Sequence, residues 1–174
     1  FVRDCHRFGI ENLEEMGYSP EEFRANIDNY LRKSTIPNLA AGKMVKLYTH
    51  YSPKYDATCG AAALTDGVSG ILNYNYNWLG FYGEPLWADI DLETVQSVKK
   101  VSLDFYFYPL SWIFLPKKVE VYVSKNGKKW EKVGEESAEN PQLLAKAFIK
   151  TFQVNFKSKK ARYVRVIAYP LSQI

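Results

Sequence analysis

Val101-Ser-Leu-Asp-Phe-Tyr-Phe-Tyr108 places an apolar side chain at every second position. Successive side chains of a β-strand point to opposite faces of a sheet, so this stretch predicts a strand with one buried face. The same period returns in Val119-Glu-Val-Tyr-Val-Ser124, which is followed by Asn126-Gly127, a pair suited to the positive φ angles of a tight hairpin turn. The sequence therefore predicts an antiparallel hairpin that joins residues 119–124 to Trp130-Glu-Lys-Val133.

Further strands are expected at residues 44–49, 86–92, 147–156 and 163–169. No long helical pattern separates these segments. About eight short strands without intervening long helices form an antiparallel sandwich. We therefore expect an all-β, jelly-roll type β-sandwich that carries a short helical segment at its N-terminus.

The N-terminal residues follow a helical period instead. Ser19-Pro-Glu-Glu22 supplies an N-cap, a proline at the first helical position and a glutamate three residues after the cap. The apolar residues that follow recur at helical spacing: Phe23, Ile27, Tyr30 and Leu31. A helix this short does not fold alone, so its apolar stripe is expected to pack on the sandwich or on another domain. We expect two units, a helical linker or tail of a preceding domain at residues 1–37 and the sandwich domain at residues 38–174.

The composition indicates a binding surface. Of the 174 residues, 47% are hydrophobic, which is enough for the core of one ordinary domain. The aromatic content of 16% exceeds what such a core needs and is typical of proteins that present rings to a ligand. The net charge of +4 is spread over interspersed lysines and glutamates, a pattern that argues against a nucleic-acid partner. No stretch is long and apolar enough to be a transmembrane segment.

The chain has two cysteines, Cys5 and Cys59. One disulfide between them is one interpretation. Because they fall in different predicted units, free buried thiols are the expectation.

No pattern of catalytic residues stands out. His6 and His50 lie near no nucleophile motif, and the sequence has neither a phosphate-binding glycine loop nor a Cys/His cluster at metal-ligand spacing. Asp89 and Asp91 share one strand face and resemble a carboxylate pair. We interpret them as outward-facing polar residues of a strand whose Ile90 and Leu92 point inward, and we expect no catalysis.

Four stretches occur in one order: Ala63-Leu-Thr-Asp-Gly-Val68, Trp78-Leu-Gly-Phe81 running into Trp87-Ala-Asp-Ile-Asp-Leu92, Ser111-Trp-Ile-Phe-Leu-Pro116 before residues 119–128, and Ala161-Arg-Tyr-Val-Arg-Val-Ile-Ala168. Together they resemble the discoidin (factor V/VIII type C) branch of the galactose-binding-like β-sandwich. The resemblance is greatest to the domain attached to bacterial β-N-acetylhexosaminidases (chitobiases) and to family 32 carbohydrate-binding modules. It implies sugar binding without catalysis, and it implies that Trp78 and Trp87 pack in the sandwich.

The connection from Tyr108 to Pro116 carries Trp112 and two prolines, which cannot donate to a sheet ladder. A loop-borne indole suits the apolar face of a sugar, and packing over the end of the sandwich is the alternative. The resemblance implies that loops at this end supply the ligand contacts. The candidate carbohydrate-binding residues are Trp112, Tyr108, Ser111, His50, Tyr51, Tyr55 and Tyr169. The loop from Tyr108 to Pro116 has no arginine, whereas some galactose binders of the family that this chain resembles have one there.

The resemblance also implies a structural calcium ion at Asp66, in the Leu64-Thr-Asp-Gly67 turn. The alternative is an aspartate that caps its own turn, which we favour.

The expected function is that of a non-catalytic module, secreted, periplasmic or on the cell surface, which binds an amino-sugar or galactose-containing glycan and holds a chitobiase-like hydrolase on it. Its second partner would be a preceding domain of the same chain. The alternatives are a spacer that packs on a catalytic domain and a protein or cell-surface recognition domain.

Overall fold

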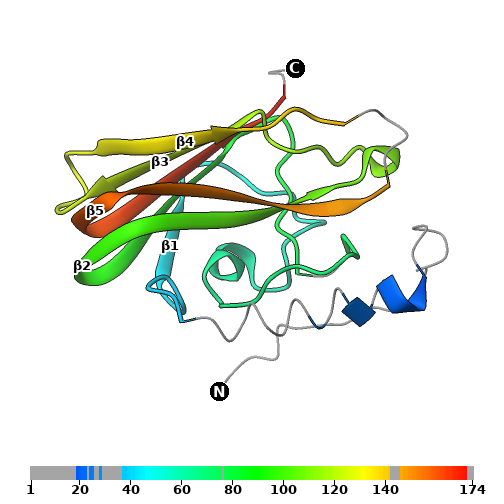
Figure 1. The fold of residues 1–174 in the computed structure, drawn as a ribbon, viewed down its shortest axis with the longest axis horizontal. Helices are drawn as coiled ribbons and strands as arrows, with labels where there is room; N and C mark the ends of the chain where they lie inside the picture. Colours follow the sequence, from blue (N-terminus) through cyan, green and yellow to red (C-terminus); the bar gives the residue numbers. More distant parts are fainter. Residues whose placement is uncertain are drawn as a thin grey trace.

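A computed structural model describes residues 19–22, 24–25, 28, 37–75, 77–141 and 146–171. Within these residues, five strands form one antiparallel sheet in the order β1-β2-β5-β3-β4. The strands are β1 (Met44–Leu47), β2 (Leu86–Phe107), β3 (Lys118–Ser124), β4 (Glu131–Ser137) and β5 (Phe148–Tyr169) (Figure 1). Two short 3-10 helices lie in the connections: η1 (Gly60–Leu64) between β1 and β2, and η2 (Pro109–Ser111) between β2 and β3. The predicted antiparallel β architecture is confirmed.

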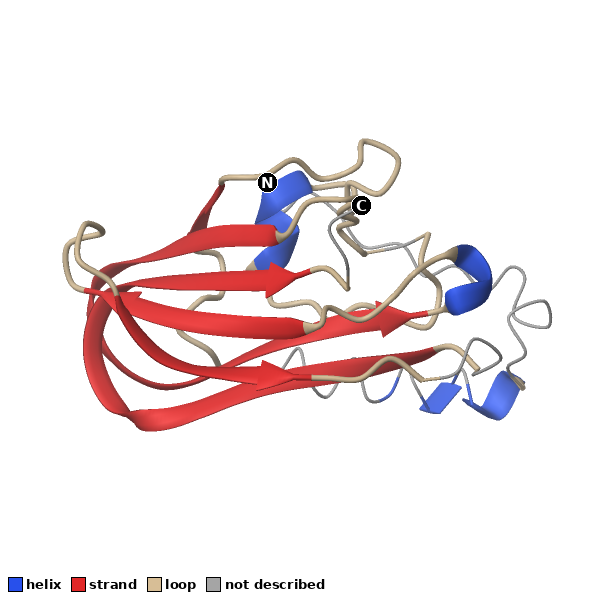
Figure 2. Ribbon diagram, turned by 90° about the horizontal axis from the view of Figure 1, so that it is seen from above, coloured by secondary structure: helices blue, strands red, loops and turns tan. Residues whose placement is uncertain are grey.

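Strands β2 and β5 are 22 residues long each and pair with one another along their length. The register shifts between Asp91 and Gln96 and again between Val98 and Lys100. Around these shifts both strands curve back on themselves (Figure 2). One layer therefore contains β1, β3, β4 and one half each of β2 and β5, and the other halves of β2 and β5 form the second layer. The region of the register shifts is called the bend below.

Seven strands were placed by residue range, out of about eight expected, and the structure has five because two pairs of them are continuous. Residues 93–100 and 157–160 contain neither glycine nor proline, so nothing breaks the chain there. Glu93 instead takes a φ of 68° and donates its backbone N–H to Asp91 Oδ1. The β2–β5 ladder accommodates the unpaired residues at the two register shifts as irregularities and continues around the bend.

The core lies between the two layers. Alternate residues of the strands face inward, as the period-two pattern predicts: Leu86, Ala88, Ile90 and Leu92 in β2, Val119, Val121 and Val123 in β3, and Val164, Val166 and Ala168 in β5. Phe107, Phe152 and Val154 meet them from the second layer. A Cβ at Gly134 in β4 would lie 2.6 Å from a methyl of Val154, so the layers are in close contact there.

The hairpin between β3 and β4 is confirmed, but its turn is wider than the tight turn predicted. Residues 125–130 connect the strands, and within them only Gly127 has a positive φ, of 70°. The Asn126 side chain accepts the backbone N–H groups of Lys128 and Lys129 at 2.9 and 3.0 Å. This side chain stabilises a wider loop than Asn-Gly alone indicates.

The capping box at the N-terminus is confirmed. Ser19 donates its backbone N–H to Glu22 Oε2 at 2.8 Å, and Glu22 donates its own N–H to Ser19 Oγ at 3.2 Å. The Glu22 carboxylate also pairs with Lys146 Nζ at 2.8 Å, beside the start of β5. The apolar stripe of Phe23, Ile27, Tyr30 and Leu31 lies outside the described residues.

The expectation of free thiols is wrong, because Cys59 is disulfide-bonded. Cys5, the only other cysteine of the sequence, lies outside the described residues. Separation into two predicted units was therefore a poor guide to cysteine pairing. Among the described residues, no helix is long and apolar enough to cross a bilayer.

Candidate functional site

Connecting segments gather at one end of the sandwich, opposite the bend. Strand β1 ends at Leu47, which faces Ala88 near the start of β2. Because β2 doubles back, its last residue, Phe107, returns to this end, where it pairs with Phe148 at the start of β5. The segments that lie together at this end are residues 48–56, 72–75, 77–85 and 108–117. They are called the loop end below (Figure 1, from the centre to the right of the view).

Trp112 projects from the loop end. The loop that carries it is closed at its base, because Tyr108 and Ile113 exchange backbone N–H···O=C bonds of 2.9 and 3.1 Å. Trp112 follows η2 with φ 58° and ψ 30°, a left-handed conformation that is unfavourable for a bulky residue. Its side chain is nevertheless displayed, since the residue is 85% exposed. Packing over the end of the sandwich does not fit a side chain this exposed.

Three tyrosines form a row beside this loop. The ring centroids of Tyr55 and Tyr74 are 6.2 Å apart, and those of Tyr74 and Tyr108 are 6.1 Å apart. All three are half-buried, and Tyr74 and Tyr108 rest on a small apolar cluster that includes Leu72 and Tyr106. Tyr55, Tyr74 and Tyr108 are called the tyrosine row below. The structure thus brings two predicted site residues together through Tyr74, which sequence reasoning missed although it lies in the Tyr- and Asn-rich segment 73–77.

His50 and Tyr82 are exposed rings at the same end. The side chain of His50 is 93% exposed, and the backbone N–H of this residue donates to Glu84 Oε2 at 2.7 Å. The His50 Nδ1 atom is 3.6 Å from the same oxygen. Tyr82, two residues before Glu84, is 84% exposed. Sequence reasoning missed Glu84 and Tyr82. The signal that could have found them is Gly83, which lies between them and takes a φ of 70° in a turn.

Three further predicted residues differ in their surroundings. Tyr51 is half-buried, with its hydroxyl 2.8 Å from where a Cβ of Gly60 would lie. Ser111 is half-buried in η2 and donates its backbone N–H to Tyr108 O at 3.0 Å. Tyr169 belongs to a different group, since its hydroxyl donates to Glu120 Oε2 at 3.0 Å and the Lys118 ammonium lies 5.1 Å from its ring centroid.

Trp78 packs as expected. Its Nε1 donates to Ile71 O at 2.8 Å, and its ring centroid is 5.3 Å from that of Tyr106. A Cβ at Gly70 would come within 2.2 Å of the indole, so only glycine fits there. This tryptophan is part of the scaffold under the loop end.

Trp87 is not in the interior, which corrects the expectation of core packing. The alternation of β2 turns Leu86 and Ala88 inward and leaves Trp87 half-buried on the outer face of the first layer. There its ring lies 5.3 Å from Tyr48, and the Arg165 guanidinium lies 5.5 Å from its centroid. It packs against the sheet without entering the core.

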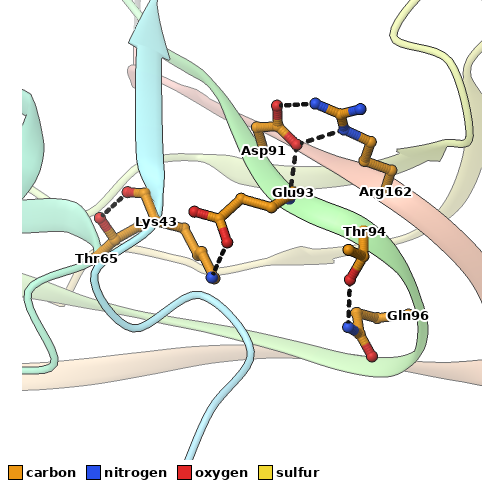
Figure 3. A network of polar contacts seen from close by, with 7 residues as sticks. All are labelled: Lys43, Thr65, Asp91, Glu93, Thr94, Gln96 and Arg162. Atoms are coloured by element: carbon orange, nitrogen blue, oxygen red, sulfur yellow. Dashed lines mark hydrogen bonds and ion pairs between the residues drawn. The ribbon is translucent and has the colours of Figure 1, made fainter.

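Asp89 and Asp91 are structural, as interpreted from the sequence. Asp89 accepts two bonds from Arg165, at 2.7 and 2.9 Å, and Asp91 accepts two from Arg162, both at 2.8 Å. Figure 3 shows Asp91 also accepting the backbone N–H of Glu93. The hydrogen bonds from Arg162 lower the pKa of Asp91. Each carboxylate is therefore bound by its own arginine in a two-bond ion pair, which accounts for it structurally.

Glu120 is the most enclosed carboxylate of the outer face, with its side chain 7% exposed. It accepts hydrogen bonds from Lys132, Tyr122 and Tyr169, and it pairs with Lys118 at 2.7 Å. Burial alone would raise the pKa of Glu120, but these donors outweigh it and hold the pKa far below its ordinary range. The group is a charge network that ties β3, β4 and β5 together.

Asp66 caps its own turn, as favoured from the sequence: its Oδ1 accepts the N–H of Val68 at 2.8 Å. Asp66 follows Thr65, whose hydroxyl donates to the Lys43 carbonyl near the bend (Figure 3). The carbonyls of Lys43 and Thr65 already accept hydrogen bonds of 2.7 and 2.6 Å. In the described part of the chain, no three His, Cys, Asp or Glu side chains gather into a possible metal site. The Asp66 carboxylate and these two carbonyls all accept hydrogen bonds within the protein, which supports turn-capping over a calcium site.

Solved structures share this fold. Chitosan-binding module 1 of a chitosanase/glucanase from Paenibacillus sp. IK-5 is 19% identical, with a TM-score of 0.54 over 78% of this chain and 88% of that one. Module 2 of the same enzyme, in complex with chitotriose, is 18% identical, with a TM-score of 0.52 over 76% of this chain and 88% of that one. A structure named SpGH29 is 16% identical, with a TM-score of 0.51 over 82% of this chain and 26% of the other. At these identities the likeness shows the fold alone.

The sequence itself gives the family. No curated protein matches it. The family model described as F5/F8 type C, NedA-like, galactose-binding domain matches residues 64–166. This range includes two of the four quoted motifs entirely and most of the first, Ala63–Val68, and of the last, Ala161–Ala168. Because this match spans more than half of the residues, the chain belongs to the F5/F8 type C family of galactose-binding-like domains.

Proposed function

We propose that this chain is a non-catalytic carbohydrate-binding module that holds a glycan at its loop end. The observation that carries the proposal is Trp112, an 85% exposed indole in a left-handed backbone conformation on a closed loop. Backbone strain of this kind persists where the surrounding structure enforces it, and it is common at ligand sites. An indole offers a flat apolar face with one polar edge, which matches the C–H face and hydroxyl rim of a sugar.

Polar groups near the loop end support the same function. The exposed His50 ring and the Glu84 carboxylate lie next to each other and can donate to and accept from sugar hydroxyls. The relation to chitosan-binding modules, one of them holding chitotriose, favours an amino-sugar glycan, and the galactose-binding family favours a galactose-containing one. The ligand class we propose is therefore an amino-sugar or galactose-containing glycan.

The wider setting is part of the proposal. The domain would span residues 38–174, with residues 1–37 as a linker or the tail of a preceding domain, in a chitobiase-like, glycan-degrading bacterial protein. The match to only 26% of SpGH29 supports a module within a longer chain. The disulfide at Cys59 supports a secreted, periplasmic or cell-surface location, where disulfides persist. Such a module raises the effective concentration of an attached enzyme at its polymer.

A second candidate is a spacer domain that packs on a neighbour through the outer face of the first layer. Arg165 is surrounded there by Tyr48, Trp87 and Trp130, with its guanidinium 4.0 Å from the Trp130 centroid. Exposed Met44 lies on the same face. Tryptophan, tyrosine, methionine and arginine are the residues enriched in protein interfaces.

A glycan array decides between these functions. Trp112→Ala should abolish binding to the glycans that the parent binds and should leave the melting temperature unchanged, because the indole contributes its area to the ligand and little to the core. The matched control is Leu110→Ala in the same loop, where the residue is 68% exposed, and it should leave binding intact. An array on which the parent binds no glycan would favour the spacer, whereas full binding by Trp112→Ala would show that the glycan is held elsewhere than at Trp112.

A further inference from the structure

Resting on the proposed function, we infer that the loop end binds an extended stretch of an oligosaccharide along the tyrosine row, and not a single terminal sugar. Trp112 accounts for one aromatic platform. The tyrosine row adds three rings from separate segments: Tyr55 from the loop after β1, Tyr74 from the segment after η1, and Tyr108 from the end of β2. A single sugar ring is about as wide as one aromatic ring, so one sugar cannot contact all of them.

The spacing of the rings suits a chain. Their centroids follow one another at 6.2 and 6.1 Å, and Tyr74 is in contact with both of the others. Tyr74 and Tyr108 are inclined by only 33°, so they present their rings in similar orientations, whereas Tyr55 is turned by 66° to Tyr74 and meets it by an edge. Each phenol also carries a hydroxyl that can donate to or accept from a sugar.

The row connects to Trp112 through the closed loop. Tyr108 forms the base of that loop by pairing with Ile113, and Trp112 is the residue just before Ile113. One end of the row is thus fixed to the segment that displays the indole. A glycan seated on Trp112 and continuing over Tyr108 would meet Tyr74 and then Tyr55.

The rings of the row pack on other residues of the domain. Tyr74 contacts Tyr106 at 6.3 Å, and Tyr106 is backed in turn by Trp78 at 5.3 Å. At the other end, Gly80 donates its N–H to Tyr55 O at 2.9 Å, and a Cβ on Gly80 would lie 2.8 Å from that of Tyr55. Rings that are already fixed lose little side-chain entropy when a ligand covers them, which favours binding over a long surface.

The experiment is calorimetric titration of the full chain with two series, N-acetylglucosamine, chitobiose and chitotriose, and galactose, galactobiose and galactotriose. We expect the trisaccharide of at least one series to bind at least tenfold more tightly than its monosaccharide. If a series binds but its trisaccharide and monosaccharide have equal affinities, the inference about the tyrosine row is wrong and the carbohydrate-binding function still stands. Absence of binding in both series would also overturn the row, and the array with Trp112→Ala would then decide the function separately.

Variants locate the effect. Tyr74→Ala and Tyr55→Ala should each lower trisaccharide affinity at least fivefold and leave the monosaccharide unaffected, whereas Trp112→Ala should lower both. Tyr163→Ala is the control, because Tyr163 pairs with Asp91 next to the bend, away from the loop end. Tyr74 also packs on Tyr106, so melting temperatures are measured, and Tyr55→Ala gives the same readout if Tyr74→Ala unfolds. Trisaccharide affinities of both variants equal to the parent's would contradict the inference.

Discussion

Single residues on the outer face show how this domain stabilises enclosed charges. Glu120 is almost enclosed, yet two ammonium groups and two phenols surround it. Removing one partner from such a group leaves an uncompensated charge, which is more costly than losing an exposed ion pair. Asp89 and Asp91 follow the same principle with one arginine each.

The pH dependence of stability should reveal Glu120. Its pKa is depressed in the folded protein, so its contribution is present above the pKa of an unfolded glutamate, about 4.3, and is lost as the pH falls below that value. Glu120→Gln should therefore be less stable than the parent at pH 7, with a difference that shrinks between about pH 5 and pH 2. Thermal melts of both proteins across this range measure it. Glu131→Gln on exposed β4 is the control, and a gap for Glu120→Gln that stays constant with pH would contradict the assignment.

At the scale of elements, periodicity was sufficient for strands with a clean alternation and insufficient elsewhere. Val119, Val121 and Val123 face the core as predicted. In β2, Leu86, Trp87 and Ala88 are consecutive apolar residues, so the pattern leaves open which face Trp87 takes. The bend could not be predicted, because no glycine or proline marks it in the sequence. The contacts of Tyr74 with Tyr55 and Tyr108 could not be predicted either, because they exist only in the folded structure. The position of Trp112 in a loop could be predicted, since the prolines on either side of it cannot donate to a sheet ladder.

The contact between layers at Gly134 is a test of the doubled-back strands. Gly134→Ala should lower the free energy of unfolding by about 1–3 kcal/mol, because its Cβ would overlap the buried Val154. Ser137→Ala, on an exposed position of the same strand, should change it by less than about 0.5 kcal/mol. Denaturant melts provide the values.

A double variant sharpens that test. If the two residues meet across the layers, Gly134→Ala combined with Val154→Ala should cost less than the sum of the single costs, since truncating the valine makes room for the new methyl. Strict additivity would mean that the layers are not in contact at this point.

At the scale of the whole molecule, one sandwich carries two surfaces with different chemistry. The loop end displays rings to solvent, while the outer face holds its rings around Arg165. The turn at Asp66 belongs to neither, because it lies beside Lys43 near the bend. Its hydrogen bonds to Lys43 and Val68 are made within the protein.

Calcium should accordingly have little effect on this domain. An ion that bound the folded state alone would add about 2.7 kcal/mol at a concentration a hundredfold above its dissociation constant. We expect the melting temperature to be the same in millimolar calcium and in chelator, measured by differential scanning calorimetry. A rise of several degrees with calcium, lost in Asp66→Ala, would show that the turn is a metal site after all.

The pairing of β2 with β5 also sets when the domain can form. Leu86, the first residue of β2, pairs with Ala168, near the last residue of β5. During synthesis, β2 therefore leaves the ribosome long before its partner exists, with its apolar side chains uncovered. Contacts this distant along the chain make folding slow, because loop closure precedes any stabilising pairing. Until β5 emerges, the nascent chain exposes an unpaired strand edge, which makes this interval the one in which a chaperone would be most useful.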